Sequence, residues 1–127
     1  MIVLDASALL ALINNEPGSD VVARGAAVDD ATISSVNYAE VLQKAARLGV
    51  ATEDVDVELD ALSISVSHFG RLDARLAALF FRDRSGLSLA DRVCLALARR
   101  LSSPAYTADR AWQSWAEDFG VEVQVIR

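Results

Sequence analysis

The segment Ile2-Val3-Leu4-Asp5-Ala6-Ser7-Ala8-Leu9 is a short apolar run that ends in a carboxylate at Asp5. Three apolar residues in a row are typical of a strand that is buried on both faces of a sheet. Residues 7–14 then continue with helical periodicity, and Ser7 is a candidate N-cap for that helix. The chain is therefore predicted to begin as a strand followed by a helix, with an acid at the junction.

The same alternation of strand and helix runs to the end of the chain. Further strands are predicted at 31–34, 63–67, 104–107 and 121–126, and further helices at 21–28, 36–48, 53–62, 71–83, 89–101 and 108–117. This order predicts an α/β fold, an α/β/α sandwich with a mostly parallel central sheet. The 127 residues contain no repeat or linker, so we expect a single domain over 1–127.

Composition excludes several classes of protein. The chain is 53% hydrophobic and 24% charged, which is typical of a globular protein and not of a disordered one. Cys94 is the only cysteine, which excludes an intramolecular disulfide and a cysteine-rich zinc site, and it lies on an apolar helix stripe. The chain shows no signal peptide, and no apolar run approaches the roughly 20 residues of a membrane span. We therefore expect a cytoplasmic protein with no membrane attachment.

The charge balance argues against simple electrostatic binding of nucleic acid. The formal net charge is −6, from 18 acids against 12 bases. All the bases except Lys44 are arginines, and arginine binds phosphate through two parallel hydrogen bonds. A protein of this charge that acts on nucleic acid would need a divalent cation to mask its carboxylates.

Four acids lie where predicted strands give way to helices. Asp5 follows the first strand, Glu40 lies early in the helix after the second, Asp91 opens the helix 89–101, and Asp109 follows the run that ends at Thr107. In open parallel sheets, ligands bind at the carboxyl ends of the strands. Carboxylates gathered there repel one another unless a cation joins them, and ligation by oxygen alone suits Mg²⁺ or Mn²⁺.

Each of these acids also has a purely structural interpretation. Asp5 is a favoured helix cap, and Ser88 with Asp91 matches a capping box. Asp109 can complement the dipole of a helix capped by Thr107. Glu40 falls on a polar helix face with Asn37, Lys44 and Arg47, where Glu40 and Lys44 can form a solvated pair one turn apart. The spacing alone leaves both interpretations open.

The four junction segments, taken in order, carry a family resemblance. They are Ile2-Val-Leu-Asp5-Ala-Ser7-Ala8-Leu9, Ser34-Ser-Val-Asn-Tyr-Ala-Glu40-Val, Leu87-Ser-Leu-Ala-Asp91-Arg-Val-Cys-Leu-Ala-Leu-Ala98 and Tyr106-Thr107-Ala-Asp109-Arg110-Ala-Trp112. This ordered set resembles the PIN-domain ribonucleases, and within them the VapC toxins of toxin–antitoxin pairs. The resemblance covers essentially the whole chain, although residues 50–67 are not distinctive.

The resemblance implies a metal-dependent endoribonuclease. By position, Asp5, Glu40, Asp91 and Asp109 correspond to the acidic quartet that binds Mg²⁺ or Mn²⁺ and carries out catalysis. Ser7 and Thr107 correspond to supporting hydroxyls. The implied reaction is hydrolysis of RNA by an activated water, which leaves a 5′-phosphate and a 3′-hydroxyl without a protein nucleophile.

The resemblance also implies partners, and it leaves rivals to be tested. It implies an RNA substrate, a homodimer, and inhibition by a cognate VapB-like antitoxin that inserts a peptide near the active site. One alternative is a non-catalytic PIN-like module that binds RNA or protein. A receiver-like signalling domain is disfavoured, because such a domain needs a lysine after a late strand and Lys44 lies in an early helix.

Overall fold

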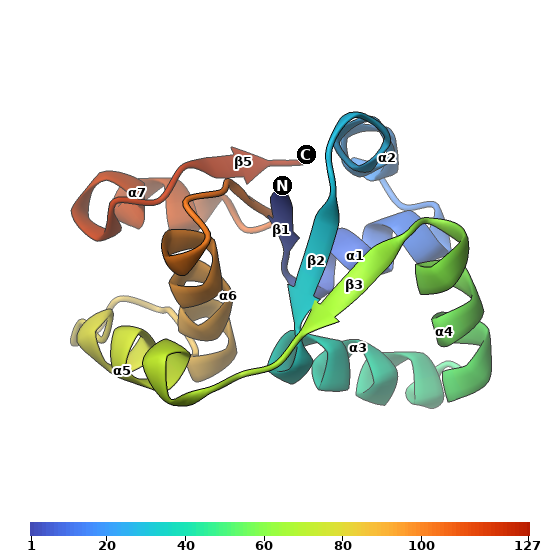
Figure 1. The fold of residues 1–127 in the computed structure, drawn as a ribbon, viewed down its shortest axis with the longest axis horizontal. Helices are drawn as coiled ribbons and strands as arrows, with labels where there is room; N and C mark the ends of the chain where they lie inside the picture. The colour runs from blue at the N-terminus through green and yellow to red at the C-terminus, as the bar shows by residue number, and fades with distance from the viewer.

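The computed structural model describes residues 1–127 as a five-stranded sheet with helices on both sides (Figure 1). The elements are β1 (Ile2–Leu4), α1 (Ala6–Asn14), α2 (Ser19–Val28), β2 (Ala31–Ser34), α3 (Ser35–Arg47), α4 (Thr52–Ala61), β3 (Ile64–Ser67), α5 (Arg71–Leu79), α6 (Leu89–Arg100), β4 (Ala105–Thr107), the 3-10 helix η1 (Arg110–Trp112), α7 (Gln113–Phe119) and β5 (Val123–Val125). The strand order is β3-β2-β1-β4-β5, and every pairing is parallel. The predicted α/β/α fold class is confirmed.

The central strand β1 is buried on both faces because each face meets a separate hydrophobic cluster. Ile2 and Leu4 belong to one cluster, which also takes apolar side chains from α1, α2, α3 and α4. Val3 points to the other side and joins a second cluster built from α5, α6, η1 and α7. Figure 1 shows these two groups of helices on opposite sides of the strands. Cys94 is free and fully buried in the second cluster, as its place on an apolar stripe predicts.

Helix α5 is shorter than the periodicity of residues 71–83 predicts. It ends at Leu79, and the carbonyls of Leu79 and Phe81 accept hydrogen bonds from the Arg82 guanidinium at 2.8 and 2.9 Å. Phe80 stacks on Phe119 of α7 with ring centroids 4.3 Å apart. The side chain of Arg82 thus caps the helix, and packing against α7 turns the chain away.

Two predicted N-caps are wrong. Asp5 caps α1, so Ser7 lies within the first turn of that helix. The predicted helix 108–117 is instead the 3-10 helix η1, capped by Asp109, followed by α7. Thr107 caps neither, because the amide from which its hydroxyl accepts is that of Asp109, before η1 begins. In both places the side chain that caps the helix is a carboxylate of the predicted site.

The order of strands in the sheet reverses between β1 and β4. From β1 the chain builds outward through β2 and β3, and it then returns to place β4 on the other side of β1. Open α/β sheets bind ligands at such a reversal, beyond the carboxyl ends of the strands. Asp5 directly follows β1, and Asp109 lies two residues after β4, so both acids lie at this point.

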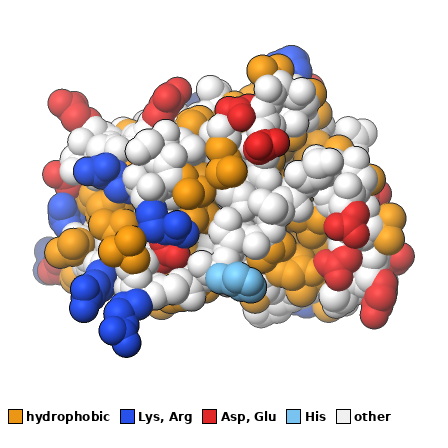
Figure 2. Space-filling view, in the orientation of Figure 1, with side chains coloured by type: hydrophobic (Ala, Val, Ile, Leu, Met, Phe, Trp, Pro, Cys, Tyr) orange, Lys and Arg blue, Asp and Glu red, His pale blue; other side chains and the backbone are white.

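Charge is unevenly distributed along the chain and over the surface. Residues 71–100 carry seven arginines and three acids, whereas residues 1–70 carry eleven acids and three bases. Figure 2 shows acidic side chains on the side of α4 and basic side chains on the side of α5.

None of the helices has the length and apolar character needed to cross a membrane.

Candidate active site

A pocket of about 290 Å³ lies at the reversal point. Its lining residues come from β1–α1, α3, α6 and the turn after β4, and they are Asp5, Ala6, Ser7, Asn37, Glu40, Lys44, Asp91, Ala108 and Asp109. All four acids at the predicted junctions therefore line one pocket, although Asp5 and Asp109 are more than 100 positions apart in the sequence. Of the two hydroxyl residues predicted to support them, Ser7 lines the pocket, and Thr107 is buried and donates a hydrogen bond to Asp5.

Asp5 is the most enclosed of the four acids, with 6% of the residue exposed. Its Oδ1 accepts hydrogen bonds from the Ser7 hydroxyl at 2.7 Å and from the Ala8 amide at 2.8 Å, and its Oδ2 accepts from the Thr107 hydroxyl at 2.6 Å. Burial nevertheless raises the pKa of Asp5 from 3.8 to about 6, and the charge of Asp91 adds to this effect. The three hydrogen bonds oppose the rise and fix the carboxylate in one orientation.

The hydroxyls of Ser7 and Thr107 also connect Asp5 to the turn after β4. Ser7 Oγ accepts from the Ala108 amide at 2.9 Å, and Thr107 Oγ1 accepts from the Asp109 amide at 3.0 Å. Each hydroxyl thus donates to Asp5 and accepts from the backbone beside Asp109. This arrangement holds the ends of β1 and β4 in a fixed relation.

Asp91 is held by the predicted capping box at the start of α6. Its Oδ2 accepts from the Ser88 amide at 2.9 Å, and its own amide donates to Ser88 Oγ at 3.1 Å. Burial raises the pKa of Asp91 above its ordinary value, the hydrogen bonds with Ser88 oppose that rise, and the charges of Asp109 and Glu40 reinforce it. The negative charges of Asp109 and Glu40 therefore make ionisation of Asp91 less favourable.

Glu40 and Asp109 also have local partners. Glu40 Oε1 lies 3.3 Å from Lys44 Nζ, in the predicted pair one helical turn apart. Asp109 Oδ1 accepts from the Ala111 amide at 3.0 Å as the cap of η1. Each of these acids therefore has the local structural role expected of it and also lines the shared pocket.

Asn37 lines the pocket but does not lie on the polar helix face that its helical periodicity predicts. The helical wheel put it on a polar face with Glu40, but Asn37 is 1% exposed. Its Nδ2 donates to the Ala90 carbonyl of α6 at 3.0 Å, and its Oδ1 has no partner. A buried acceptor without a partner costs about 1–3 kcal/mol. The signal in the sequence was its position three residues before Glu40, which puts both side chains on one face of α3.

The donor atoms of this pocket suit a hard divalent cation. All four carboxylates and the Asn37 amide present oxygen, which Mg²⁺ and Mn²⁺ prefer. No three Asp, Glu, His or Cys side chains lie close enough together to ligate one ion. Asp91, Asp109 and Glu40 each have a local partner instead. For one cation to be held here, carboxylates of the pocket would have to move closer together.

The sequence matches the PIN domain family model over residues 2–117. The chain therefore belongs to the PIN domain family, whose members are generally nucleases that use divalent metal ions. The resemblance noted from the four junction segments is confirmed. No curated protein matches the sequence significantly.

Several solved structures share the fold. FitAcB from Neisseria gonorrhoeae is 22% identical over 97% of this chain and 96% of its own, with a TM-score of 0.66. VapBC2 from Rickettsia felis, bound to a DNA fragment from its promoter, is 15% identical over 98% of both chains, with a TM-score of 0.68. A toxin–antitoxin complex from Klebsiella pneumoniae is 18% identical over 86% of this chain and 87% of that one, with a TM-score of 0.65. At these identities the likeness shows a common fold.

Proposed function

We propose that this PIN-domain protein is the toxin of a VapBC-type toxin–antitoxin pair and acts as a metal-dependent endoribonuclease. Asp5, Glu40, Asp91 and Asp109 hold Mg²⁺ or Mn²⁺ and carry the catalysis. The observation that supports this proposal is the convergence of these four carboxylates on one pocket at the reversal of the sheet. Nothing in the local sequence around each acid requires them to meet.

The residues of the pocket have distinct parts in the proposed reaction. A bound divalent cation supplies positive charge for the phosphodiester and activates water for attack. Ser7 and Thr107 hold Asp5 in one orientation, and Ser88 does the same for Asp91. Because the pKa of Asp5 is raised to about 6, Asp5 is ionised at neutral pH and becomes protonated below pH 6. We therefore expect cation binding and cleavage to weaken in that range.

The partners follow from the same family. We propose that a VapB-like antitoxin inhibits the protein, that the toxin is a homodimer in the cytoplasm, and that residues 1–127 fold as a single domain. Support for an antitoxin comes from the structural neighbours, since the Klebsiella pneumoniae structure is described as a toxin–antitoxin complex. The −6 net charge suits a basic inhibitory peptide near the acidic pocket.

A non-catalytic PIN-like binding module is the alternative. Two observations favour this binding module. The carboxylates already have local partners, and no three of them lie within ligating distance of one ion. Binding of Mn²⁺ to the purified protein distinguishes the two functions. A nuclease requires the cation, whereas the binding module does not.

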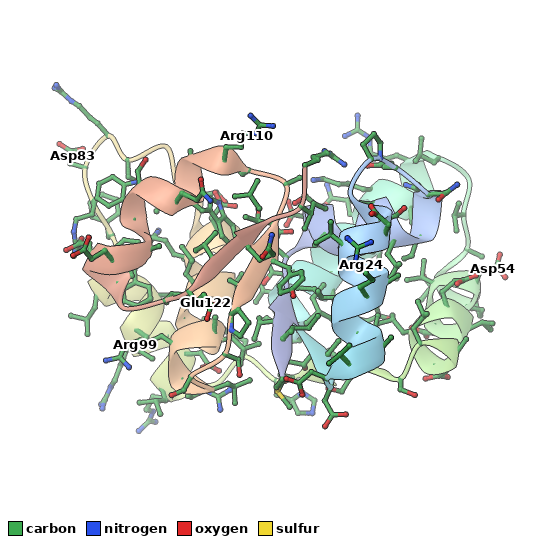
Figure 3. The ribbon with its side chains drawn as sticks, turned by 90° about the horizontal axis from the view of Figure 1, so that it is seen from above. Arg24, Asp54, Asp83, Arg99, Arg110 and Glu122 are labelled. Atoms are coloured by element: carbon green, nitrogen blue, oxygen red, sulfur yellow. The ribbon has the colours of Figure 1, made fainter.

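Cleavage in vitro tests the nuclease directly. Purified wild type should cleave structured RNA only when Mg²⁺ or Mn²⁺ is present, and Asp5→Asn and Asp91→Asn should each lose at least about 100-fold of that activity. Asp54→Asn is the matched control, because Asp54 lies on the outer side of α4 (Figure 3). Near-normal cleavage by Asp5→Asn and Asp91→Asn would reject these assignments.

Expression without an antitoxin tests the function in cells. New 5′-phosphate RNA ends should appear at a few recurrent sites with wild type and with Asp54→Asn, and they should be missing with Asp5→Asn. Those sites also identify the RNA target. Equal patterns in wild type and Asp5→Asn would favour the binding module.

A further inference from the structure

The amide of Asn37 has an orientation that leaves its oxygen unpaired. The Ala90 carbonyl can only accept a hydrogen bond, so the atom that faces it at 3.0 Å must be the Nδ2 donor. Oδ1 is then a buried acceptor without a partner, in a residue that is 1% exposed and lines the acidic pocket. Only three buried side-chain polar atoms lack a partner, and Oδ1 of Asn37 is the only oxygen among them.

The charge of the pocket determines which ligand suits this oxygen. Four carboxylates and one lysine line the pocket, so the lining carries an excess of negative charge. That charge attracts a cation. Hard divalent cations commonly bind neutral amide oxygens as well as carboxylates. An anionic or apolar ligand would leave Oδ1 without a partner.

The position of Asn37 connects two of the helices that carry the acids. Asn37 lies three residues before Glu40 on α3, and its Nδ2 donates to Ala90, the residue before Asp91 on α6. Its oxygen is therefore held at a fixed place with respect to both helices. The nitrogen of the amide is bonded to α6, and its oxygen is buried beside the pocket without a partner in the protein.

We propose that Asn37 Oδ1 is a fifth oxygen donor of the pocket and helps to hold the divalent cation, directly or through a water molecule. This inference rests on the cation-binding part of the proposed function and does not depend on RNA cleavage. It adds a neutral ligand to the acidic quartet and gives the unpaired oxygen its partner.

Mn²⁺ binding to the purified, RNA-free protein tests the proposal by calorimetry. Asn37→Leu removes both polar atoms at similar size, and it should raise the dissociation constant for Mn²⁺ by about 10- to 100-fold. Its melting temperature without cation should be unchanged or higher, because the unpaired oxygen is removed together with the donor. A purely structural asparagine would give the opposite pattern, with a lower melting temperature and an unchanged dissociation constant.

Asn37→Asp tests the oxygen independently of the donor to Ala90. It keeps an oxygen at this position and loses the donor to Ala90, so it should bind Mn²⁺ at least as tightly as wild type. If it binds as weakly as Asn37→Leu, the donor matters and the proposal is wrong. Asn37→Ala replaces Asn37→Leu if the leucine variant does not fold.

Thr32→Val is the control for loss of a buried polar group. Thr32 is fully buried outside the pocket and donates to the Ser65 carbonyl at 3.0 Å. This variant should lower the melting temperature and leave Mn²⁺ affinity unchanged. A dissociation constant within twofold of wild type for Asn37→Leu, or for Asn37→Ala in its place, would overturn the proposal, as would no Mn²⁺ binding by wild type. Wild type that binds Mn²⁺ but cleaves no RNA would reject the nuclease alone.

Discussion

At the scale of single residues, Asp5 is subject to two opposing effects. Three hydrogen bonds favour its charged form, yet burial is the larger effect and raises its pKa from 3.8 to about 6. That rise corresponds to a cost of roughly 3 kcal/mol for holding Asp5 ionised at neutral pH. Groups destabilised in this way are concentrated at functional sites. A nearby cation would offset the cost.

Replacement of Asp5 should therefore stabilise the protein in a pH-dependent way. Between pH 4 and 6 folded wild type binds a proton that the unfolded chain does not, so its stability falls as pH rises through this range. Without cation, Asp5→Asn should gain up to roughly 3 kcal/mol relative to wild type between pH 4 and 7.5. Urea denaturation in EDTA across that range measures the difference. A difference that does not vary with pH would contradict the raised pKa.

Lys44 would compete for Glu40 with the proposed cation. The two side chains are 50% and 36% exposed, so their pair contributes about 0–1 kcal/mol to folding. Lys44→Gln should therefore change the melting temperature little, while Mn²⁺ affinity rises about two- to fivefold as a positive charge leaves the pocket. Arg24→Gln is the control, because Arg24 pairs with Asp20 one helical turn away and lies outside the pocket. Equal effects of both variants on Mn²⁺ affinity would contradict the competition.

The residues of the site were predictable to different degrees. The convergence of the four acids was predictable because strand-to-helix junctions are visible in the sequence, and the fold brings those junctions together. The burial of Asn37 was not predictable, because a helical wheel orders side chains around an axis without showing what covers each face. The resemblance gave Thr107 as a supporting hydroxyl, but it did not give Asp5 as its partner, since that contact joins neighbouring strands β1 and β4 from opposite ends of the chain.

At the scale of elements, the periodicity predicted which segments are helices better than where they end. The apolar stripe of α6 predicted a helix over 89–101, and the helix spans Leu89–Arg100. Helix α5 ends early because Arg82 caps it and Phe80 packs on α7, and both contacts depend on tertiary structure. Residues 108–117 divide into η1 and α7 because Asp109 caps a short 3-10 turn before the longer helix begins.

An ion pair between Asp73 and Arg100 connects the start of α5 to the end of α6. Asp73 is 3% exposed, and its Oδ2 accepts from Arg100 Nη2 at 3.2 Å and from the Gly70 amide at 3.3 Å. Removal of the arginine leaves a buried carboxylate with little compensation, so Arg100→Met should cost about 2–4 kcal/mol of unfolding free energy. Urea denaturation measures this loss.

The neighbouring arginine provides the control for that measurement. Arg99 is exposed and forms no ion pair, so Arg99→Met should change stability by about 0.5 kcal/mol or less. The double variant Asp73→Leu with Arg100→Met should recover much of the loss, because the unpaired buried charge is gone. Equal stability of Arg99→Met and Arg100→Met would show that the pair contributes nothing.

At the scale of the whole molecule, the site is assembled only by the complete fold. Asp5 comes from the end of β1, Glu40 from α3, Asp91 from α6 and Asp109 from the turn after β4. Helix α3 packs with the first hydrophobic cluster and α6 with the second, so the pocket takes residues from both sides of the sheet. Cation binding should therefore depend on the integrity of both clusters.

The two clusters should unfold together, because β1 belongs to both through Ile2, Val3 and Leu4. Trp112 is fully buried in the second cluster and Trp115 packs against it, so tryptophan fluorescence reports that side. Far-ultraviolet circular dichroism reports all helices. A single domain predicts coincident urea transitions for the two signals.

Leu9→Ala, in the first cluster, should lower the free energy of unfolding by about 2–5 kcal/mol and move the tryptophan-fluorescence transition by the same amount. Leu48→Ala, at a position 70% exposed, should move neither signal. If Leu9→Ala shifts circular dichroism and leaves tryptophan fluorescence in place, the two sides of the sheet are separate folding units and the single-domain proposal is wrong.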